Sequence, residues 1–339
     1  MESCKRGRQS FCPPNHPRIT AWASVAGKKE SQGPLGDLFD YSSADTFFGQ
    51  KTWEQAEQHM QQLALRILTT KARIRRQDLD VVLSGDLLNQ CIGSSFGLAN
   101  QGIPHLGLYG ACSTMAESIL LAAVLVGSGA ADRAAAMTSS HFASSERQYR
   151  LPLAYGGQRS PTAQRTVTGA GAVLRMRDGS GPEIESCTIG AVRELGIRDA
   201  ANMGAAMAPA AYETIRAHLE DLHIGPEHYD LLVTGDLGRT GTAMLLELAR
   251  LDGLCLGGRL CDCGMMIFDP VRQDVHSGGS GCGCSAVTLC SDLLGRLHSG
   301  KLRRILFCGT GALLSPVSTQ QGLPIPAVCH AVAISGEDI

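Results

Sequence analysis

The sequence predicts an α/β protein made of two similar halves, and three observations lead to that class. Short apolar runs of strand length alternate along the chain with longer segments of helical periodicity. The 339 residues include 40 glycines and 5% aromatic residues, a balance that suits closely packed strands and helices. A strand followed by Gly-Asp occurs at 78–87 and again at 228–237, which indicates an internal repeat.

In the first half, apolar runs predict the strands, and segments of helical periodicity predict the helices. The predicted strands cover 18–26, 79–84, 103–109, 133–138 and 167–176, and 103–109 is expected to be short and buried. The predicted helices cover 53–69, 94–99 and 118–126, and the last is apolar on nearly every face, as in a buried helix. Residues 142–169 are polar and irregular, and they predict a long functional loop.

The second half is predicted in the same way. Its strands are expected at 183–190, 229–234, 263–268, 304–308 and 327–334. Its helices are expected at 209–222, with Pro209 near the first turn, and at 242–251 and 284–297. Both halves then share the order strand, Gly-Asp, strand, Gly-rich turn, apolar helix and strand.

This shared order predicts two halves, 1–180 and 181–339, packed about a pseudo-twofold axis. The alternative is a chance likeness, because βαβ units share such patterns generally. If the halves are related, their equivalent loops converge at the interface. Cys112 would then face Gly235-Asp236 and the 278–284 turn.

Composition excludes several function classes. A net charge of −2 and a pI near 6.5 argue against nucleic-acid binding, which needs a basic excess. No apolar run reaches the length of a bilayer span, and the first residues lack the apolar core of a secretory signal. The 13 cysteines are an odd number scattered over both halves, which indicates reduced thiols in a reducing compartment.

The turn around Cys112 is the strongest candidate site. Gly110-Ala-Cys-Ser-Thr114 lies between a predicted strand and a predicted helix, so free helical N–H groups point at whatever lies beside it. A thiol at this position is expected to have a lowered pKa. An anion would find ready donors there. The turn could therefore serve a nucleophile or an anion site.

Beyond this turn, the motifs resemble known families. The duplicated halves and the Cys at the first helix's N-terminus resemble the thiolase superfamily, and 166–174 resembles the Gly-Ala-Gly-Ala strand of ketoacyl synthases. A closer resemblance, spanning about 20–332, is to the stage V sporulation protein AD family. It is carried by the motifs Gly33-Pro-Leu-Gly-Asp-Leu-Phe39, Gly85-Asp-Leu-Leu-Asn-Gln90, Gly110-Ala-Cys-Ser-Thr114, Thr138-Ser-Ser-His141, Glu146-Arg-Gln148, Tyr155-Gly-Gly-Gln158, Met203-Gly-Ala-Ala-Met-Ala-Pro-Ala210, Gly278-Gly-Ser-Gly-Cys282 and Gly309-Thr-Gly-Ala-Leu-Leu-Ser-Pro316. The chain departs from that family in a longer N-terminal extension containing Cys and Arg.

The resemblance implies a thiolase-like five-layer αβαβα fold and a function in bacterial spores. That family binds dipicolinic acid (pyridine-2,6-dicarboxylate), free or as its calcium chelate, for transport across the inner spore membrane. We therefore expect a binding protein without a cofactor, in which calcium enters only with the ligand. Its partners would be other stage V sporulation channel proteins, and it would lie at the membrane surface of the developing spore. Thiolase relatives commonly dimerise, so a homodimer is also compatible with the resemblance.

The competing hypothesis is a thiolase-like or ketoacyl-synthase-like acyltransferase with Cys112 as nucleophile. Such an enzyme needs a base and oxyanion donors within reach of the thiol. Where the superfamily places a His in the second half, this chain has Asp236. His141 and His276 are the remaining candidates for the base. A third hypothesis is a scaffold with a vestigial pocket.

Further ligand-binding candidates follow the strands of the first half. Asp86 and Asn89 would suit a calcium chelate, because calcium takes carboxylate and carbonyl oxygens, although Asp86 could equally cap the next helix. Other polar groups near the Cys112 turn could bind carboxylate oxygens or could satisfy local backbone groups; these are Ser113, Thr138, Ser139, Ser140 and His141.

Two further residue sets could carry chemistry. Arg147 and Arg150 could pair with carboxylates or could lie on a solvated face. The pairs Cys261/Cys263 and Cys282/Cys284 lack the usual Cys-x₂-Cys spacing, so we expect no zinc site.

Overall fold

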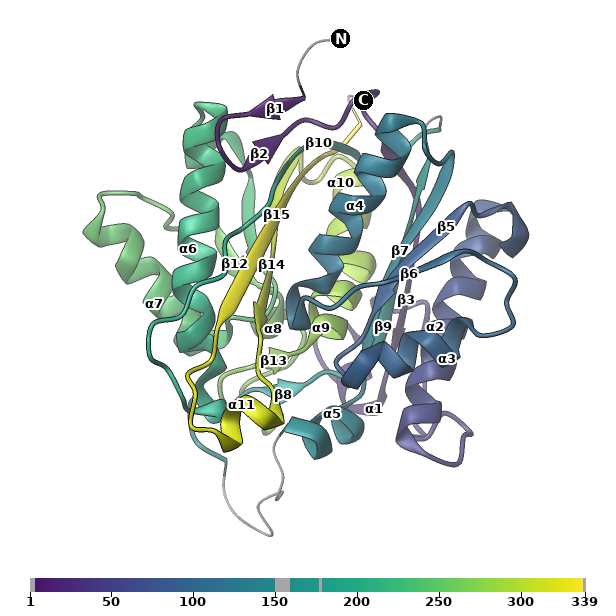
Figure 1. Cartoon of the computed structure of the whole chain (residues 1–339), viewed down its shortest axis with the longest axis horizontal. Helices are drawn as coiled ribbons and strands as arrows, with labels where there is room; N and C mark the ends of the chain where they lie inside the picture. The colour runs from purple at the N-terminus through teal and green to yellow at the C-terminus, as the bar shows by residue number, and fades with distance from the viewer. Residues whose placement is uncertain (1–3, 150–158, 177–178, 338–339) are drawn as a thin grey trace.

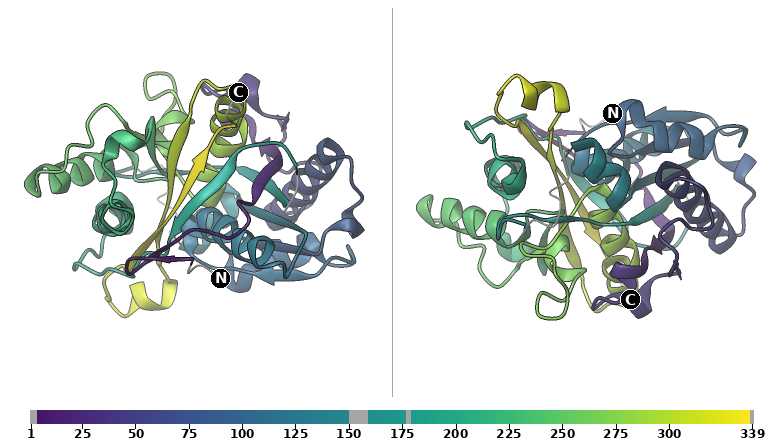
Figure 2. Two further views of the ribbon diagram at one scale, coloured as in Figure 1. Left: turned by 90° about the horizontal axis from the view of Figure 1, so that it is seen from above. Right: turned by 90° about the horizontal axis from the view of Figure 1, so that it is seen from below.

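The computed structural model describes residues 4–149, 159–176 and 179–337. Helices cover the outer faces of two β-sheets, and further helices fill the space between the sheets (Figure 1). The views from above and below show α6 and α7 at one side of the molecule and α2 and α3 at the other, with the sheets between them (Figure 2). The α/β, five-layer thiolase-like class predicted from the sequence is confirmed.

The described strands form one continuous 13-stranded sheet, and its two five-strand halves, which we call the first and the second sheet, have the same strand order. The first runs β3 (Arg18–Ala26), β9 (Gly169–Met176), β7 (Arg133–Ser140), β5 (Val81–Gly85) and β6 (His105–Gly107). The second runs β10 (Glu183–Thr188), β15 (Ala327–Ser335), β14 (Arg304–Ala312), β11 (Leu231–Thr234) and β12 (Leu260–Asp262).

Pairing directions are also repeated. In both sheets the first three strands pair antiparallel and the last three pair parallel. The sheets meet where Arg18 of β3 pairs with Glu183 of β10. The division at 180 lies in the connection between β9 and β10, and it stays a prediction that the halves are separate domains.

The helices form three layers. The outer helices are α2 (Trp53–Ala72) and α3 (Ile92–Leu98) on the first sheet, and α6 (Met203–Leu222) and α7 (Gly238–Leu251) on the second. Between the sheets lie α4 (Thr114–Ser128) and α9 (Cys282–Thr288), and α9 continues through a π-helical turn, Leu289–Leu293, into α10 (Leu294–His298). Besides short 3₁₀ helices, the other short elements are β1 (Lys5–Arg6), β2 (Ser10–Phe11), α1 (Lys28–Ser31), β4 (Tyr41–Ser42), α5 (Phe142–Tyr149), β8 (Arg165–Thr166), α8 (Cys263–Met266), β13 (Gly279–Ser280) and α11 (Pro316–Gln320).

The apolar character of α4 follows from its position. Because it packs against β7 on one side and β14 on the other, Met115, Ile119 and Val126 are fully buried. In the part of the chain that the structure describes, one helical segment, Ala111–Ser128, is long and apolar enough to cross a membrane. It is 72% buried inside the protein, as expected for a core helix.

Four predictions about local structure were wrong. Residues 103–109 were expected to form a buried strand, but β6 is a short edge strand and Leu106 is 49% exposed. The expected loop at 142–169 begins with α5 and ends in β8, while 150–158, including Arg150 and the Tyr155 motif, lie outside the described residues.

The other two errors are in the second half. The expected strand at 263–268 begins with α8, because the side chain of Asp262 accepts a hydrogen bond from Met265 N and starts a helical turn. Helix α6 begins at Met203, so Pro209 lies inside it and not in its first turn.

Candidate functional site

Cys112 lies in a tight turn just before α4. The turn is fixed by local hydrogen bonds: Ser113 Oγ donates to Gly110 O at 2.7 Å, and Thr114 Oγ1 donates to Ala111 O at 2.7 Å. The end of β14 presses on this turn from the second half, since a Cβ at Gly311 would lie 2.3 Å from Gly110 O. The thiol is therefore held at the interface between the halves.

Asp236 faces the thiol from the end of β11. It accepts a hydrogen bond from Cys112 Sγ, as the predicted convergence of the two halves requires. Its Oδ2 also accepts Gly281 N at 2.9 Å and Ser280 Oγ at 3.2 Å, and its Oδ1 accepts Thr310 Oγ1 at 2.8 Å. The carboxyl group is thus fully surrounded by donors.

The expectation of a lowered thiol pKa is wrong. Burial, and then the neighbouring charge of Asp236, raise the pKa of Cys112 well above its ordinary value. Burial also raises the pKa of Asp236 itself. The helix N-terminus is outweighed because a thiolate here would be desolvated beside a carboxyl group. Cys112 is therefore held as a neutral thiol.

A narrow cavity, the thiol cavity, opens over Cys112. It holds about 40 Å³. Tyr109 and Tyr149 close part of it, with their hydroxyl oxygens 2.6 Å apart. The full lining is Leu87, Tyr109, Ala111, Cys112, Ser145, Glu146, Tyr149, Thr166, Met203, Ser280, Ala312 and Leu314. Among these described residues there is no histidine. The space fits about one water molecule.

Asp86 lies at the position equivalent to Asp236 but has other partners. It is fully buried, and its carboxylate accepts Leu88 N at 2.9 Å, Ser94 N at 2.6 Å and Ser94 Oγ at 2.7 Å. These bonds hold the start of α3, which agrees with the capping alternative. Asn89 is exposed and pairs with Gln148 of α5.

The hydroxyl candidates at the end of β7 already donate within the protein. Thr138 Oγ1 donates to Cys282 O at 3.1 Å, Ser139 Oγ to Glu57 Oε1 at 3.0 Å, and Ser140 Oγ to Val167 O at 2.7 Å. All three are fully buried. Of the predicted ligand-binding residues, Cys112 is the one that lines the thiol cavity.

The two candidate bases lie elsewhere. His141 Nε2 lies 2.8 Å from Thr46 O and lines a different hollow. His276 Nε2 lies 3.0 Å from Asp274 Oδ1 and lies outside the lining of the thiol cavity. Arg147, also a candidate, forms an ion pair with Glu54 and lies over the ring of Trp53.

A second hollow, which we call the basic basin, lies on the other side of α5 and holds about 610 Å³. Residues of α1, α5 and β8 line it, and these elements lie together at the lower edge of Figure 1. Its cationic lining residues are Lys28, Lys29, Arg165 and Arg272, and its aromatic ones are Trp53 and Phe142. The sequence analysis missed Lys29 as a site residue, because no motif joins it to Arg165.

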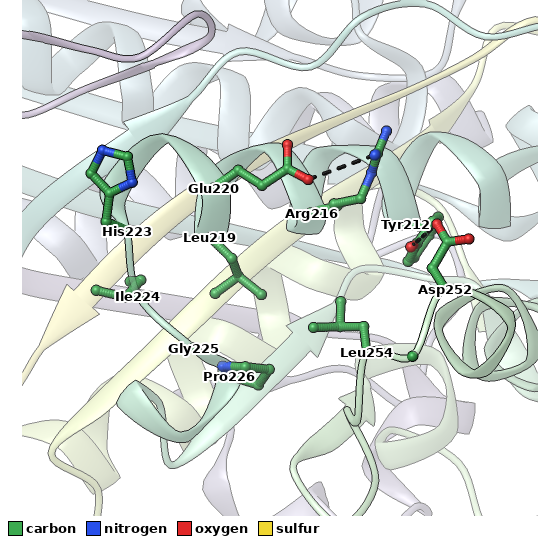
Figure 3. Close-up of a pocket in the computed structure, with 11 residues that line it drawn as sticks. Tyr212, Arg216, Leu219, Glu220, His223, Ile224, Gly225, Pro226, Asp252 and Leu254 are labelled. Carbon is green, nitrogen blue, oxygen red and sulfur yellow. Dashed lines mark hydrogen bonds and ion pairs between the residues drawn. The ribbon is translucent and has the colours of Figure 1, made fainter.

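A wider groove of about 950 Å³ lies at the C-terminal end of α6 (Figure 3). Two polar pairs lie in it: Arg216 lies 3.6 Å from Glu220, and Tyr212 donates to Asp252. In the described parts of the chain, no group of three or more His, Cys, Asp or Glu residues could hold a metal ion. The expected absence of zinc at the paired cysteines stays a prediction.

Solved structures place the fold in a known class. The chain is similar to 3-oxoacyl-[acyl-carrier-protein] synthase III from Aquifex aeolicus VF5, with a TM-score of 0.57 and 14% identity over 94% of this chain and 99% of that one. It is also similar to cerulenin-bound OleA from Xanthomonas, with a TM-score of 0.59 and 16% identity over 94% and 96%. The protein therefore has the thiolase-like fold.

Sequence comparison narrows this class to one family. The family model for stage V sporulation protein AD matches residues 7–335. The stage V sporulation protein AD of Bacillus subtilis (strain 168) is 42% identical over 326 residues, which cover 96% of each chain. The chain belongs to the stage V sporulation protein AD family, and it is a sporulation protein.

Proposed function

We propose that this protein binds dipicolinic acid, free or as its calcium chelate, and releases it chemically unaltered during uptake into and release from the spore core. One observation carries the non-enzymatic part of the proposal. Burial and the carboxyl group of Asp236 raise the pKa of the Cys112 thiol well above its ordinary value, and they outweigh the hydrogen bonds of Gly281 and Ser280, which lower it. A condensing enzyme needs the opposite, a base that helps to form the thiolate.

The family supports the ligand. The chain belongs to the stage V sporulation protein AD family. The choice of dipicolinate as the bound molecule rests on the resemblance to that family given in the sequence analysis. We place the protein at the surface of the inner spore membrane, as the soluble subunit of a channel formed with other stage V sporulation proteins. Co-purification with those membrane partners from sporulating cells tests this assignment, and recovery of the protein without any of them would contradict it.

Calorimetric titration tests the ligand. Purified protein is titrated with dipicolinate, with and without one equivalent of calcium, and saturable binding is expected. Benzoate, which has one carboxylate and no ring nitrogen, is the matched control and should bind more weakly. A titration without binding would instead favour a scaffold with a vestigial pocket.

The fold favours a second candidate, an acyltransferase, since the structural neighbours include acyl-carrier-protein synthases. Incubation with an acyl-CoA followed by mass spectrometry of the Cys112 peptide separates the two candidates. We expect no acyl adduct, because the thiol is neutral and its cavity holds about 40 Å³. An adduct that forms and turns over would establish the enzyme and refute the binding protein.

We also propose a homodimer formed along β6. Among the described residues, no strand pairs with the outer edge of β6, and Leu106 in this strand and Tyr109 after it are 49% and 43% exposed. Light scattering is expected to give twice the mass of 35.8 kDa for the wild type and the monomer mass for Leu106→Lys. A wild-type monomer would contradict this assignment.

A further inference from the structure

The thiol cavity is too small for dipicolinate as it stands. It holds about 40 Å³, whereas small-molecule sites in proteins usually hold about 300–1,000 Å³. The space fits about one water molecule, and a pyridine ring with two carboxyl groups is several times larger. Part of the cavity wall therefore has to move before such a molecule can reach Cys112.

One part of that wall is the side chain of Tyr149, the last residue of α5. It packs against the cluster formed by Leu87, Cys112 and Cys282. An aromatic side chain of the protein thus already covers the sulfur. Its six-membered ring is planar and close in size to the pyridine ring of dipicolinate.

The surroundings of this ring would suit another aromatic ring in its place. Besides Tyr149, apolar side chains of Leu87, Ala312 and Leu314 line the cavity. If the Tyr149 side chain left, the cavity would gain the space of one aromatic ring between these apolar walls. This is the space that the pyridine ring of the ligand needs.

The hydroxyl group of Tyr149 has two polar contacts beside the cavity. It donates to Leu87 O, and its oxygen lies 2.6 Å from the hydroxyl oxygen of Tyr109. Burial raises the pKa of Tyr149, so the hydroxyl group keeps the proton that it donates. If Tyr149 moved away, the hydroxyl group of Tyr109 would become available to donate to a carboxylate.

The two ends of α5 are held differently. Near its start, Ser144 Oγ donates to Glu57 Oε2 at 2.9 Å, and both residues are buried. Near its end, Gln148 Nε2 donates to Asn89 Oδ1 at 2.9 Å, and Asn89 N donates to Gln148 Oε1 at 3.2 Å, at the exposed surface. Water can replace exposed hydrogen bonds at little cost, whereas a buried group left without a partner is costly. Gln148 and Tyr149 can therefore swing away while the start of α5 stays in place.

We propose that Tyr149 is a removable plug, whose ring occupies the place of the ligand's aromatic ring over Cys112 in the empty protein. The ligand enters when Gln148 and Tyr149 swing away from the loop that carries Leu87 and Asn89. This inference rests on the proposed function and adds Tyr149 to the residues predicted from the sequence. Asn89, which was predicted to bind the ligand, becomes a residue that holds the plug closed.

The test is alkylation of Cys112 by iodoacetamide in the full chain, measured by mass spectrometry of the Cys112 peptide. Tyr149→Ala removes the plug, so Cys112 should react about tenfold faster. Tyr149→Phe keeps the ring and loses both hydroxyl contacts, so the reaction should become about threefold faster. Tyr41→Ala changes a tyrosine of the first half that is 44% exposed, and this matched control should leave the rate unchanged.

Cys308 is the internal control for general loosening of the structure. It is fully buried in β14 and lies outside the lining of the thiol cavity, so its alkylation rate should be the same in all variants. An equal increase at Cys112 and Cys308 would overturn the plug assignment. Thermal unfolding shows which variants are folded. Tyr149→Phe removes a single oxygen atom, so it decides the question if Tyr149→Ala does not fold.

A second measurement tests whether the ligand takes the place of the plug. Saturating dipicolinate should slow the alkylation of Cys112 in Tyr149→Ala to the wild-type rate or below, because its ring fills the space that the tyrosine has left. Calorimetric titration of the wild type tests the proposed function separately.

The outcomes separate the two proposals. If the wild type and Tyr149→Ala do not bind dipicolinate, the proposed function fails, whereas the alkylation rates without ligand still show whether Tyr149 covers the thiol. If dipicolinate binds but leaves Cys112 of Tyr149→Ala unprotected, the plug assignment is overturned while the function stands. Wild-type alkylation rates in the folded Tyr149 variants would overturn it as well.

Discussion

Asp86 and Asp236 occupy the same place in the two halves, yet they do different things. Each follows a glycine at the end of a parallel strand, β5 or β11. Asp86 bonds to Leu88 and Ser94 of its own half and holds the start of α3. Asp236 bonds across the interface to Cys112, and within its own half to Gly281 and Thr310.

The difference shows how a duplicated fold can produce one asymmetric site. Both carboxyl groups are fully buried and both have raised pKa values, so burial alone does not distinguish them. The hydrogen-bond partners determine the different roles of the two residues, and these partners depend on the loop that follows each strand. In the first half, backbone N–H groups after the strand donate hydrogen bonds to Asp86. In the second half, the carboxyl group of Asp236 points at the thiol.

The largest expected difference between Asp86 and Asp236 is in their effect on stability. Asp86→Ala removes the acceptor for two buried N–H groups and should lower the free energy of unfolding by about 2–4 kcal/mol. Urea unfolding followed by circular dichroism measures this change. Alkylation of Cys112 should be unaffected while the variant is folded, and a changed rate would show that Asp86 also acts on the thiol.

A second effect, on the pH dependence of stability, comes from the carboxyl groups next to this pair. Burial, and then the charge of Asp86, raise the pKa of Glu57 to about 8, and burial raises that of Asp262 beside Asp236 to about 7. Both side chains keep their protons in the folded state at pH values where the unfolded chain has lost them. These two groups therefore make their whole contribution to the free energy of unfolding below about pH 4, and this contribution decreases as the pH rises towards 8.

Glu57→Gln tests that dependence. Between pH 4 and 8 the wild type should lose about 2–4 kcal/mol more than the variant, as judged from the shift in the pKa of Glu57. Urea unfolding at a series of pH values gives the two curves. Parallel curves would show that Glu57 titrates normally in the folded protein.

The next effect concerns the thiol itself. Iodoacetamide reaches the buried Cys112 only when the structure opens locally. Asp236→Asn removes a charge that, after burial, raises the pKa of Cys112, so alkylation at pH 8 should become about tenfold faster. Mass spectrometry of the Cys112 peptide measures the rate separately from the other cysteines. Asp86→Asn is the matched control and should leave the alkylation rate of Cys112 unchanged. An equal increase in both variants would show that Asp86 and Asp236 do not differ in their effect on the thiol.

The smallest effect sets the baseline for these comparisons. Arg147→Ala breaks an exposed ion pair with Glu54 and a contact with the Trp53 ring, so it should change the free energy of unfolding by less than about 1 kcal/mol. Urea unfolding measures it, with Arg147→Lys as the control that keeps the charge. A loss as large as that of Asp86→Ala would mean that surface charges, too, hold the first half together.

The sequence predicted the fold well because each element of the repeat is recognisable from residues that are close together in the chain. The strand–Gly-Asp pattern, the apolar α4 segment and the Gly-rich turn at 278–283 each identify an element locally. The exposure of β6 was missed, since an apolar run does not reveal whether a second strand covers it. The helical turn after Asp262 was missed because its apolar residues fit a strand equally well.

The site was predictable in part. The repeat placed Cys112 opposite Asp236, and the structure brings the two into contact. The raised pKa of the thiol was not predictable, because it depends on burial by both halves. Nor was the basic basin, since Lys29 and Arg165 are far apart in the chain and meet only when β8 pairs with β13.

The pairing of β8 with β13 links the basin physically to Cys112. Arg165 N donates to Gly278 O at 2.8 Å, and Val167 N donates to Ser280 O at 2.8 Å. Ser280 and Gly281 in turn bond to Asp236, which accepts the thiol hydrogen bond. The two short strands therefore form one hydrogen-bonded path from the backbone of Arg165 to the carboxyl group beside Cys112, so a movement at one end of this path would change the surroundings of the sulfur at the other end.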